Sequence, residues 1–126
     1  MLKVILLSVG CVVASLGSAA ACDVRESYIA RLGPADHFNS NGERLASAAA
    51  IIRQDRANYH QFGKADPEDQ GDDFFASKEN RAKLERMIEN GQSAPGAIAE
   101  VVNGTPLVEV IVCRGSQGDY INVIVK

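Results

Sequence analysis

The sequence predicts an α+β fold in which about three helices pack on a C-terminal antiparallel β-hairpin or small sheet. Between residues 43 and 104, apolar side chains recur at the three- and four-residue spacing of helices. The C-terminal end instead holds two β-rich runs, 107–113 and 120–125, joined by a short polar turn. Because a hairpin alone is marginal in water, helices are expected to cover one of its faces.

The chain begins with a segment that belongs to targeting and not to the fold. Residues 1–21 carry one charge, at Lys3, then an apolar run over 4–16 and a small-residue end. The apolar run is too short for a permanent transmembrane helix, and the Ala-x-Ala ending is what a signal peptidase recognises. We therefore expect residues 1–21 to be a cleaved signal peptide and residues 22–126 to be a single small exported domain, periplasmic or secreted.

The cysteine that follows this segment leaves two interpretations. Cys22 is either the first mature residue or the lipid-bearing cysteine of a bacterial lipoprotein, which would tether the protein to a membrane. Lipoprotein signals usually place a larger aliphatic residue three positions earlier, where this chain has Ala19. Loss of Cys11 with the signal leaves Cys22 and Cys113, an even pair in an oxidising compartment. We therefore predict a Cys22–Cys113 disulfide, with lipid anchoring as the alternative.

The charge balance is acidic. The whole chain has 13 Lys and Arg against 16 Asp and Glu, a net charge of −3. Binding to nucleic acid or to anionic membrane surfaces needs clustered Lys and Arg, so neither is expected as the main activity. The predicted mature chain is long enough for one modest hydrophobic core.

The first half of the predicted domain gives one ambiguous segment and one long helix. Residues 24–32 fit both a helical and an alternating pattern, so this segment stays undecided. Residues 35–42 are predicted to form a polar loop. Residues 43–60 are predicted to form a helix that ends before Gly63. The apolar face of this helix holds Leu45, Ala48, Ala49, Ile52 and Tyr59.

The next segments are predicted as a solvated loop and two shorter helices. Residues 64–73 are rich in carboxylates and almost free of apolar side chains. Ser77 can cap a helix that closes at Gly91, and a third helix is expected to begin near Pro95 and to end before Gly104. The side chains expected to be buried in these helices are Leu84, Met87, Ile88, Ile98, Val101 and Val102.

The two C-terminal strands differ in their pattern. In 120–125 the alternation places Ile121, Val123 and Val125 toward the helices. The run 107–113 is apolar on both faces apart from Glu109, which predicts a strand inside a sheet, beside a third strand or a partner.

Clustered carboxylates in the 64–73 loop are the first candidate site. Oxygen atoms held on a turn are the ligands that Ca²⁺ prefers. The match to a calcium loop is incomplete, because counting from Asp66 puts Ser77 at the twelfth place, where a bidentate Glu is required. The alternative is a solvated loop that keeps an exported protein soluble. The candidate calcium ligands are Asp66, Glu68, Asp69 and Asp72.

The second candidate site lies near the end of the predicted long helix. Arg56 and His60 are four residues apart and share a helix face, with Asp55 beside them. An acid, a cation and an imidazole together could provide the general base of a hydrolase. The alternative is an ordinary surface ion pair with a favourable contact between His60 and the helix dipole. The other histidine, His37, has no sequence neighbour that would make it a ligand.

Motifs for other chemistries do not occur in the sequence, which has no Gly-x-Ser-x-Gly elbow, Cys-x-x-Cys pair, His-Glu-x-x-His pair or phosphate-binding glycine loop. The leading hypothesis is a non-enzymatic, periplasmic binding protein for a protein or envelope component, with the 107–113 strand available to pair with another chain. The alternatives are a calcium-dependent protein that uses loop 66–73 and a hydrolase built around Asp55 and His60.

Overall fold

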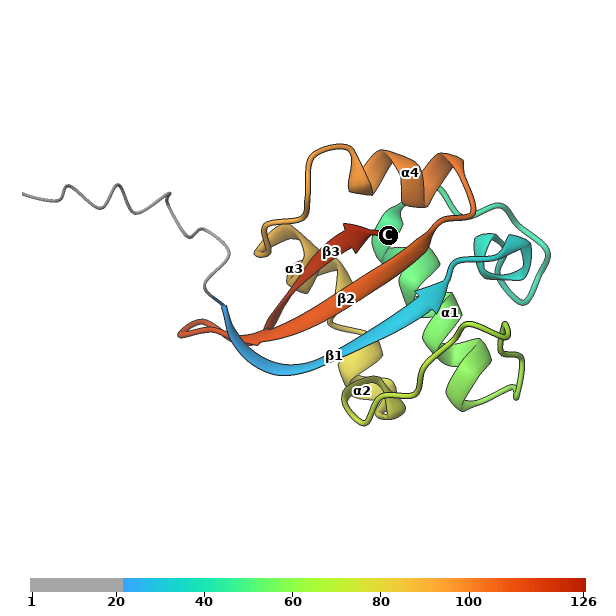
Figure 1. The fold of residues 1–126 in the computed structure, drawn as a ribbon. Helices are drawn as coiled ribbons and strands as arrows, with labels where there is room; N and C mark the ends of the chain where they lie inside the picture. Colours follow the sequence, from blue (N-terminus) through green and yellow to red (C-terminus); the bar gives the residue numbers. More distant parts are fainter. Residues whose placement is uncertain (1–21) are drawn as a thin grey trace, which may run out of the picture.

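A computed structural model describes residues 22–126, and the predicted signal peptide lies outside the described residues. The described chain has the predicted α+β fold, in which helices pack on a three-stranded antiparallel sheet of order β1-β2-β3 (Figure 1). The elements in chain order are β1 (Asp23–Arg31), the 3₁₀ turn η1 (Pro34–His37), α1 (Ala48–His60), the 3₁₀ turn η2 (Phe74–Ala76), α2 (Lys78–Arg81), α3 (Leu84–Glu89), α4 (Ala97–Asn103), β2 (Leu107–Arg114) and β3 (Tyr120–Val125).

The segment that the sequence left undecided is strand β1, which pairs antiparallel with β2. Only its second half alternates between buried and partly exposed residues, with Tyr28 and Ala30 in the core. Its first half is largely exposed and is interrupted by a bulge between Val24 and Glu26. The alternation is too short to identify a strand, and the distant partner β2 decides the conformation.

Strand β2 lies in the middle of the sheet, with β1 as the third strand that its two apolar faces predicted. The facing predicted for β3 is confirmed, because Ile121 and Val123 are fully buried and Val125 packs against the core. The opposite face of the sheet is more open, and Ile124 is exposed there beside the Glu109–Lys126 ion pair.

Loops cover both edges of the sheet. Along β3, Ala94 N–H donates to Val123 O at 3.0 Å, and Val123 N–H donates to Ser93 Oγ at 3.1 Å. Gly91 fits this edge because a Cβ atom there would lie 1.7 Å from the carbonyl oxygen of Ile121. Along β1, Gln70 exchanges two hydrogen bonds with the backbone of Ile29. The sequence hypothesis included the pairing of another chain with a strand of this sheet. The backbone groups named here are already hydrogen-bonded and are not available for such pairing.

The helices differ from the prediction in their limits. Helix α1 begins at Ala48 and not at 43, because Ser47 caps it by accepting a hydrogen bond from Ala50 N–H. Residues 43–46 instead belong to a turn in which Leu45 N–H donates to His37 O at 2.8 Å. The predicted helix after Ser77 is two short helices, α2 and α3, and Ser77 caps the first of them as expected. In α4, Val101 is buried as predicted, but the predicted burial of Ile98 is wrong, because this residue is 40% exposed. Within residues 22–126, no helix is long and apolar enough to cross a membrane.

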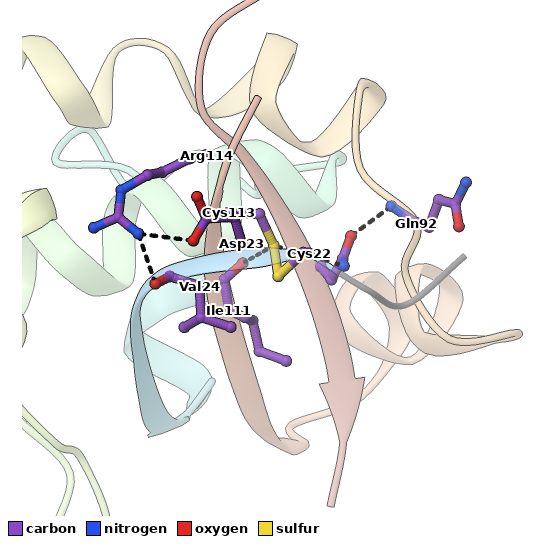
Figure 2. The surroundings of a disulfide bond; sticks show 8 residues. Cys22, Asp23, Val24, Gln92, Ile111, Cys113 and Arg114 are labelled. Carbon is purple, nitrogen blue, oxygen red and sulfur yellow. Dashed lines mark hydrogen bonds and ion pairs between the residues drawn. A yellow bond between two sulfur atoms is a disulfide. The ribbon is translucent and has the colours of Figure 1, made fainter. Parts of the chain in front are cut away.

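The predicted Cys22–Cys113 disulfide is present, with the two Cα atoms 5.4 Å apart (Figure 2). It joins the start of the described chain to the end of β2. Beside it, the Arg114 guanidinium donates to Asp23 Oδ1 at 3.1 Å and to the Val24 carbonyl at 2.9 Å, as Figure 2 shows. Cys113 is fully buried, so the bridge anchors the exposed start of β1 to the core.

We expect loss of this bridge to lower the free energy of unfolding by about 4 kcal/mol, because it closes a loop of 91 residues in sequence and restricts the unfolded chain. Cys22→Ser is the variant to use, since Cys22 is only partly buried. The measurement is urea unfolding of both proteins with and without reductant. Reductant should destabilise the wild type and leave the variant unchanged, and equal behaviour of the two proteins would contradict the prediction.

Candidate functional site

The cluster predicted near the end of the long helix lies inside the protein. Asp55 and Arg56 have exposed fractions of 1% and 0%, so the alternative of an ordinary surface ion pair is wrong. They are buried because they continue the inward stripe of α1, three and four residues after Ile52. A helical wheel extended past the last apolar residue would have placed them inside.

Arg56 is the centre of this cluster. Its guanidinium carbon lies 4.1 Å from the centroid of the Tyr28 ring and 4.7 Å from that of Tyr59. Its Nε donates to Asp55 at 2.8 Å, and its Nη1 donates to Asp72 at 2.9 Å and to the Gln70 carbonyl at 3.0 Å. A buried cation is therefore neutralised by carboxylates from the helix and from the acidic loop.

Asp72 joins the two sites that the sequence predicted separately. Its Oδ1 accepts a hydrogen bond from Arg56 Nη1 and lies 2.7 Å from His60 Nε2. Its Oδ2 accepts a hydrogen bond from Phe75 N–H at 2.6 Å. The His60 ring stacks edge-on against Tyr59, and its side chain is 13% exposed. One carboxylate thus fixes the end of α1, the acidic loop and η2 relative to one another. We call Tyr28, Asp55, Arg56, Tyr59, His60 and Asp72 the Arg56 network.

The other predicted calcium ligands are held apart from Asp72 by protein partners. Asp69 accepts hydrogen bonds from the backbone N–H groups of Arg31 and Asp66, at 2.8 and 2.9 Å. Glu68 forms an ion pair with Arg31 at 2.6 Å. In the described part of the chain, no group of three or more His, Cys, Asp or Glu side chains converges in a way that could hold a metal ion. Asp69 and Glu68 therefore attach the loop to β1 through Arg31, and the Asp66 carboxylate lies beside Gly33.

Two more carboxyl groups meet beside the network. Asp36 accepts a hydrogen bond from Gly33 N–H at 3.0 Å and one from Asn58 Nδ2 at 2.9 Å. Burial raises the pKa of Asp36, which lies within hydrogen-bonding reach of Asp55. Burial also raises the pKa of Asp55 well above its ordinary value, an effect that Arg56 opposes and the charge of Asp36 reinforces. Within residues 22–126, Asp55 Oδ1 has no hydrogen-bond partner, and Oδ2 accepts the hydrogen bond from Arg56 Nε.

His37 is buried, although its sequence neighbours gave no sign of it. Its Nδ1 lies 2.8 Å from the Gly33 carbonyl oxygen, and its Nε2 lies 2.9 Å from the Val101 carbonyl oxygen. The ring therefore links η1 to α4. This role is structural, since both nitrogens face backbone groups.

A surface hollow that the sequence reasoning missed lies between the segment after β1 and the end of α1. It has a volume of about 230 Å³. Two phenylalanines at its rim, Phe38 and Phe62, are 44% and 47% exposed. We call this the Phe38/Phe62 hollow, and its lining residues are Ala35, Phe38, Asn39, Ser40, Gln54, Asn58, Phe62 and Lys64. Phe62 directly precedes Gly63, and Phe38 lies four residues before Gly42, so a turn glycine near each aromatic residue was the available signal.

Tight turns fix the backbone beside the two aromatic residues. Phe38 pairs with Arg44 across a turn that Gly42 closes at a positive φ of 77°. The Arg44 guanidinium carbon lies 6.0 Å from the centroid of the Phe38 ring. At the other rim, Gly63 takes φ 64°, and Lys64 N–H donates to the Asn58 carbonyl at 2.8 Å.

Asn58 connects the hollow to the buried charges. It lies on the α1 turn that carries Arg56. Its Oδ1 accepts a hydrogen bond from Gln54 Nε2 at 2.9 Å, and its Nδ2 donates one to Asp36. The hollow therefore has a polar wall whose amides are fixed from behind. On chemistry alone, it can hold a small group that has an apolar face and a polar edge.

Comparisons of the chain with protein-family models, with curated proteins and with solved structures find no match.

Removal of one partner from the Arg56 network should destabilise the fold strongly. Asp72→Ala leaves Arg56 and His60 without a shared carboxylate in a dry site, and we expect a loss of about 3 kcal/mol in urea unfolding. Glu68→Ala, in the same loop, breaks a solvent-exposed pair and should cost at most about 1 kcal/mol. Similar losses of unfolding free energy in the two variants would show that the buried ion pair stabilises the fold no more than the exposed one.

The raised pKa of Asp55 predicts a pH-dependent contribution to stability. Protonation of Asp55 is easier in the folded than in the unfolded protein, so the contribution is complete below the ordinary pKa of 3.8 and is lost as pH rises through the folded-state value. Asp55→Asn removes this titration. The wild-type advantage over the variant in unfolding free energy should therefore shrink as pH rises above about 4.

The measurement is a set of urea unfolding curves from pH 4 to about 8 for both proteins. Asp73→Asn makes the same chemical change at an exposed position and controls for the loss of one negative charge. A difference between wild type and Asp55→Asn that stays constant with pH, or that grows, would rule out a raised pKa of Asp55.

Proposed function

We propose that this chain is an exported, periplasmic binding protein that captures its partner at the Phe38/Phe62 hollow and does not transform it. The observation that carries the proposal is the pair of exposed phenylalanines on one small hollow with a polar wall. Exposed aromatic side chains are unfavourable in water and are enriched where partners bind. The large hydrophobic side chains exposed on the described chain are Val24, Phe38, Phe62, Ile98 and Ile124.

The way the hollow is built supports binding by a preformed site. Its rim residues are held by turns, and its wall is held by the helix that contains the Arg56 network. A site fixed before contact loses less conformational freedom when the partner arrives. The Cys22–Cys113 disulfide is consistent with an oxidising compartment, which supports export.

The charged groups support binding better than hydrolysis. Asp55 is enclosed, and His60 Nε2 is engaged with a carboxylate that is itself bonded to Arg56 and to Phe75 N–H. These contacts fix the position of loop and helix. A general base that acts on substrate would need access to it.

The test compares two double variants of the disulfide-bonded protein purified from an exporting host. The first, Phe38→Ala with Phe62→Ala, removes both aromatic side chains of the hollow. The second, Val24→Ala with Ile98→Ala, removes apolar side chains of similar exposure elsewhere. Each protein is immobilised and exposed to envelope extract of its source cell, and the bound material is quantified by surface plasmon resonance and mass spectrometry. We expect the first variant to bind at least about tenfold less than wild type, and the second to bind normally.

Thermal unfolding of both variants checks that neither has lost its fold. Equal binding by the two variants would place the binding surface elsewhere. An absence of binding by the wild type would contradict the proposed function itself.

A further inference from the structure

We propose that the Phe38/Phe62 hollow binds one N-acetylated pyranose ring of a glycan. This inference rests on the proposed function and adds the chemical class of the ligand. It follows from the size of the hollow, from its aromatic rim and from the balance of donors and acceptors on its wall.

The volume limits the ligand to a group about the size of one sugar ring. Sites for drug-sized molecules usually enclose about 300–1,000 Å³. The hollow has about 230 Å³, so it can take a single ring or side chain of a larger molecule. A glycan presents such rings one after another along a flexible chain.

The aromatic rim favours a ring with apolar faces. Phe38 and Phe62 are 44% and 47% exposed, and both line the hollow. The face of an aromatic ring carries partial negative charge and attracts C–H groups. A pyranose presents C–H groups on its faces and oxygen atoms around its edge, so it meets both the rings and a polar wall.

The wall favours a ligand that mainly accepts hydrogen bonds. Within residues 22–126, the structure records no partner for the Lys64 ammonium, the Ser40 hydroxyl or Gln54 Oε1. Lys64 can only donate, and the carboxamide of Gln54 can still both donate and accept. An acetamido group supplies one acceptor and one donor, and the ring and hydroxyl oxygens supply further acceptors. The wall thus fits an acetamido sugar better than a plain hexose.

The same wall is a poor fit for a hydrophobic side chain of a protein partner. Such an anchor gains affinity by leaving water for an apolar pocket. Here amide, hydroxyl and ammonium groups line the hollow, and covering them without hydrogen bonds would be unfavourable. The free donors and acceptors therefore favour a sugar ring over an apolar side chain of a protein partner.

The experiment titrates the full disulfide-bonded protein, purified after export, with chitotetraose and follows backbone amide shifts by NMR. We expect saturable shifts at residues around the hollow, and an affinity for chitotetraose about tenfold higher than for maltotetraose, which has no acetamido groups. Phe62→Ala and Gln54→Ala should each weaken binding about tenfold or more. Ile98→Ala, at an exposed apolar position outside the hollow, should leave the affinity unchanged.

Two results would overturn the inference. One is an absence of saturable shifts with millimolar chitotetraose, and the other is binding that Phe62→Ala and Gln54→Ala leave unaffected. A second test shows whether only the sugar ligand or also the proposed function has failed. In it, envelope extract is treated with protease before the binding of the two double variants is measured. Binding that depends on the two phenylalanines and disappears with protease would retain the proposed function and replace the sugar with a protein partner. If no binding depends on the two phenylalanines, both the sugar ligand and the proposed function are rejected.

Discussion

The buried guanidinium of Arg56 is the constraint on which the rest of the structure depends. A charged group without exposure needs carboxylates and hydrogen-bond acceptors around it, and α1 provides only Asp55. Asp72 and the Gln70 carbonyl both accept hydrogen bonds from Arg56 Nη1, so the acidic loop has to fold back over the helix. In that position Gln70 also bonds the free edge of β1. One buried cation thus determines the path of the loop and closes one edge of the sheet.

The hollow depends on the same helix turn. Asn58 is two residues after Arg56, and it bonds Asp36 on one side and receives Gln54 on the other. The chain then reverses at Gly63, which brings Lys64 back to the Asn58 carbonyl and leaves Phe62 on the rim. The interior charges and the surface hollow are consecutive parts of one structural unit, so a change in the network is expected to alter the surface.

Much of the fold could be predicted from the sequence, because apolar spacing and cysteine parity are local properties. They predicted the hairpin, its inward side chains and the disulfide partner of Cys113. The strand β1 was ambiguous because its conformation depends on pairing with β2, which is distant in sequence. The sequence left open whether Asp55 and Arg56 belong to a functional cluster or to a surface ion pair, because their charge favours the surface and their helical position favours the core. The hollow was missed because Phe38 and Phe62 meet only after two turns and the helix have folded.

The composition of the network argues for a positioning role over a stabilising one. Well-packed apolar side chains of similar volume often stabilise a fold as well as a buried ion pair does, or better. What an apolar contact lacks is direction, because it tolerates small shifts of the loop. The bonds of Asp72 to Arg56, His60 and Phe75 N–H are directional and admit one placement of the acidic loop relative to α1. A domain whose only requirement was a stable core could use leucine here, whereas a domain that presents a fixed polar hollow beside the same helix turn gains from a network that holds that turn in one position.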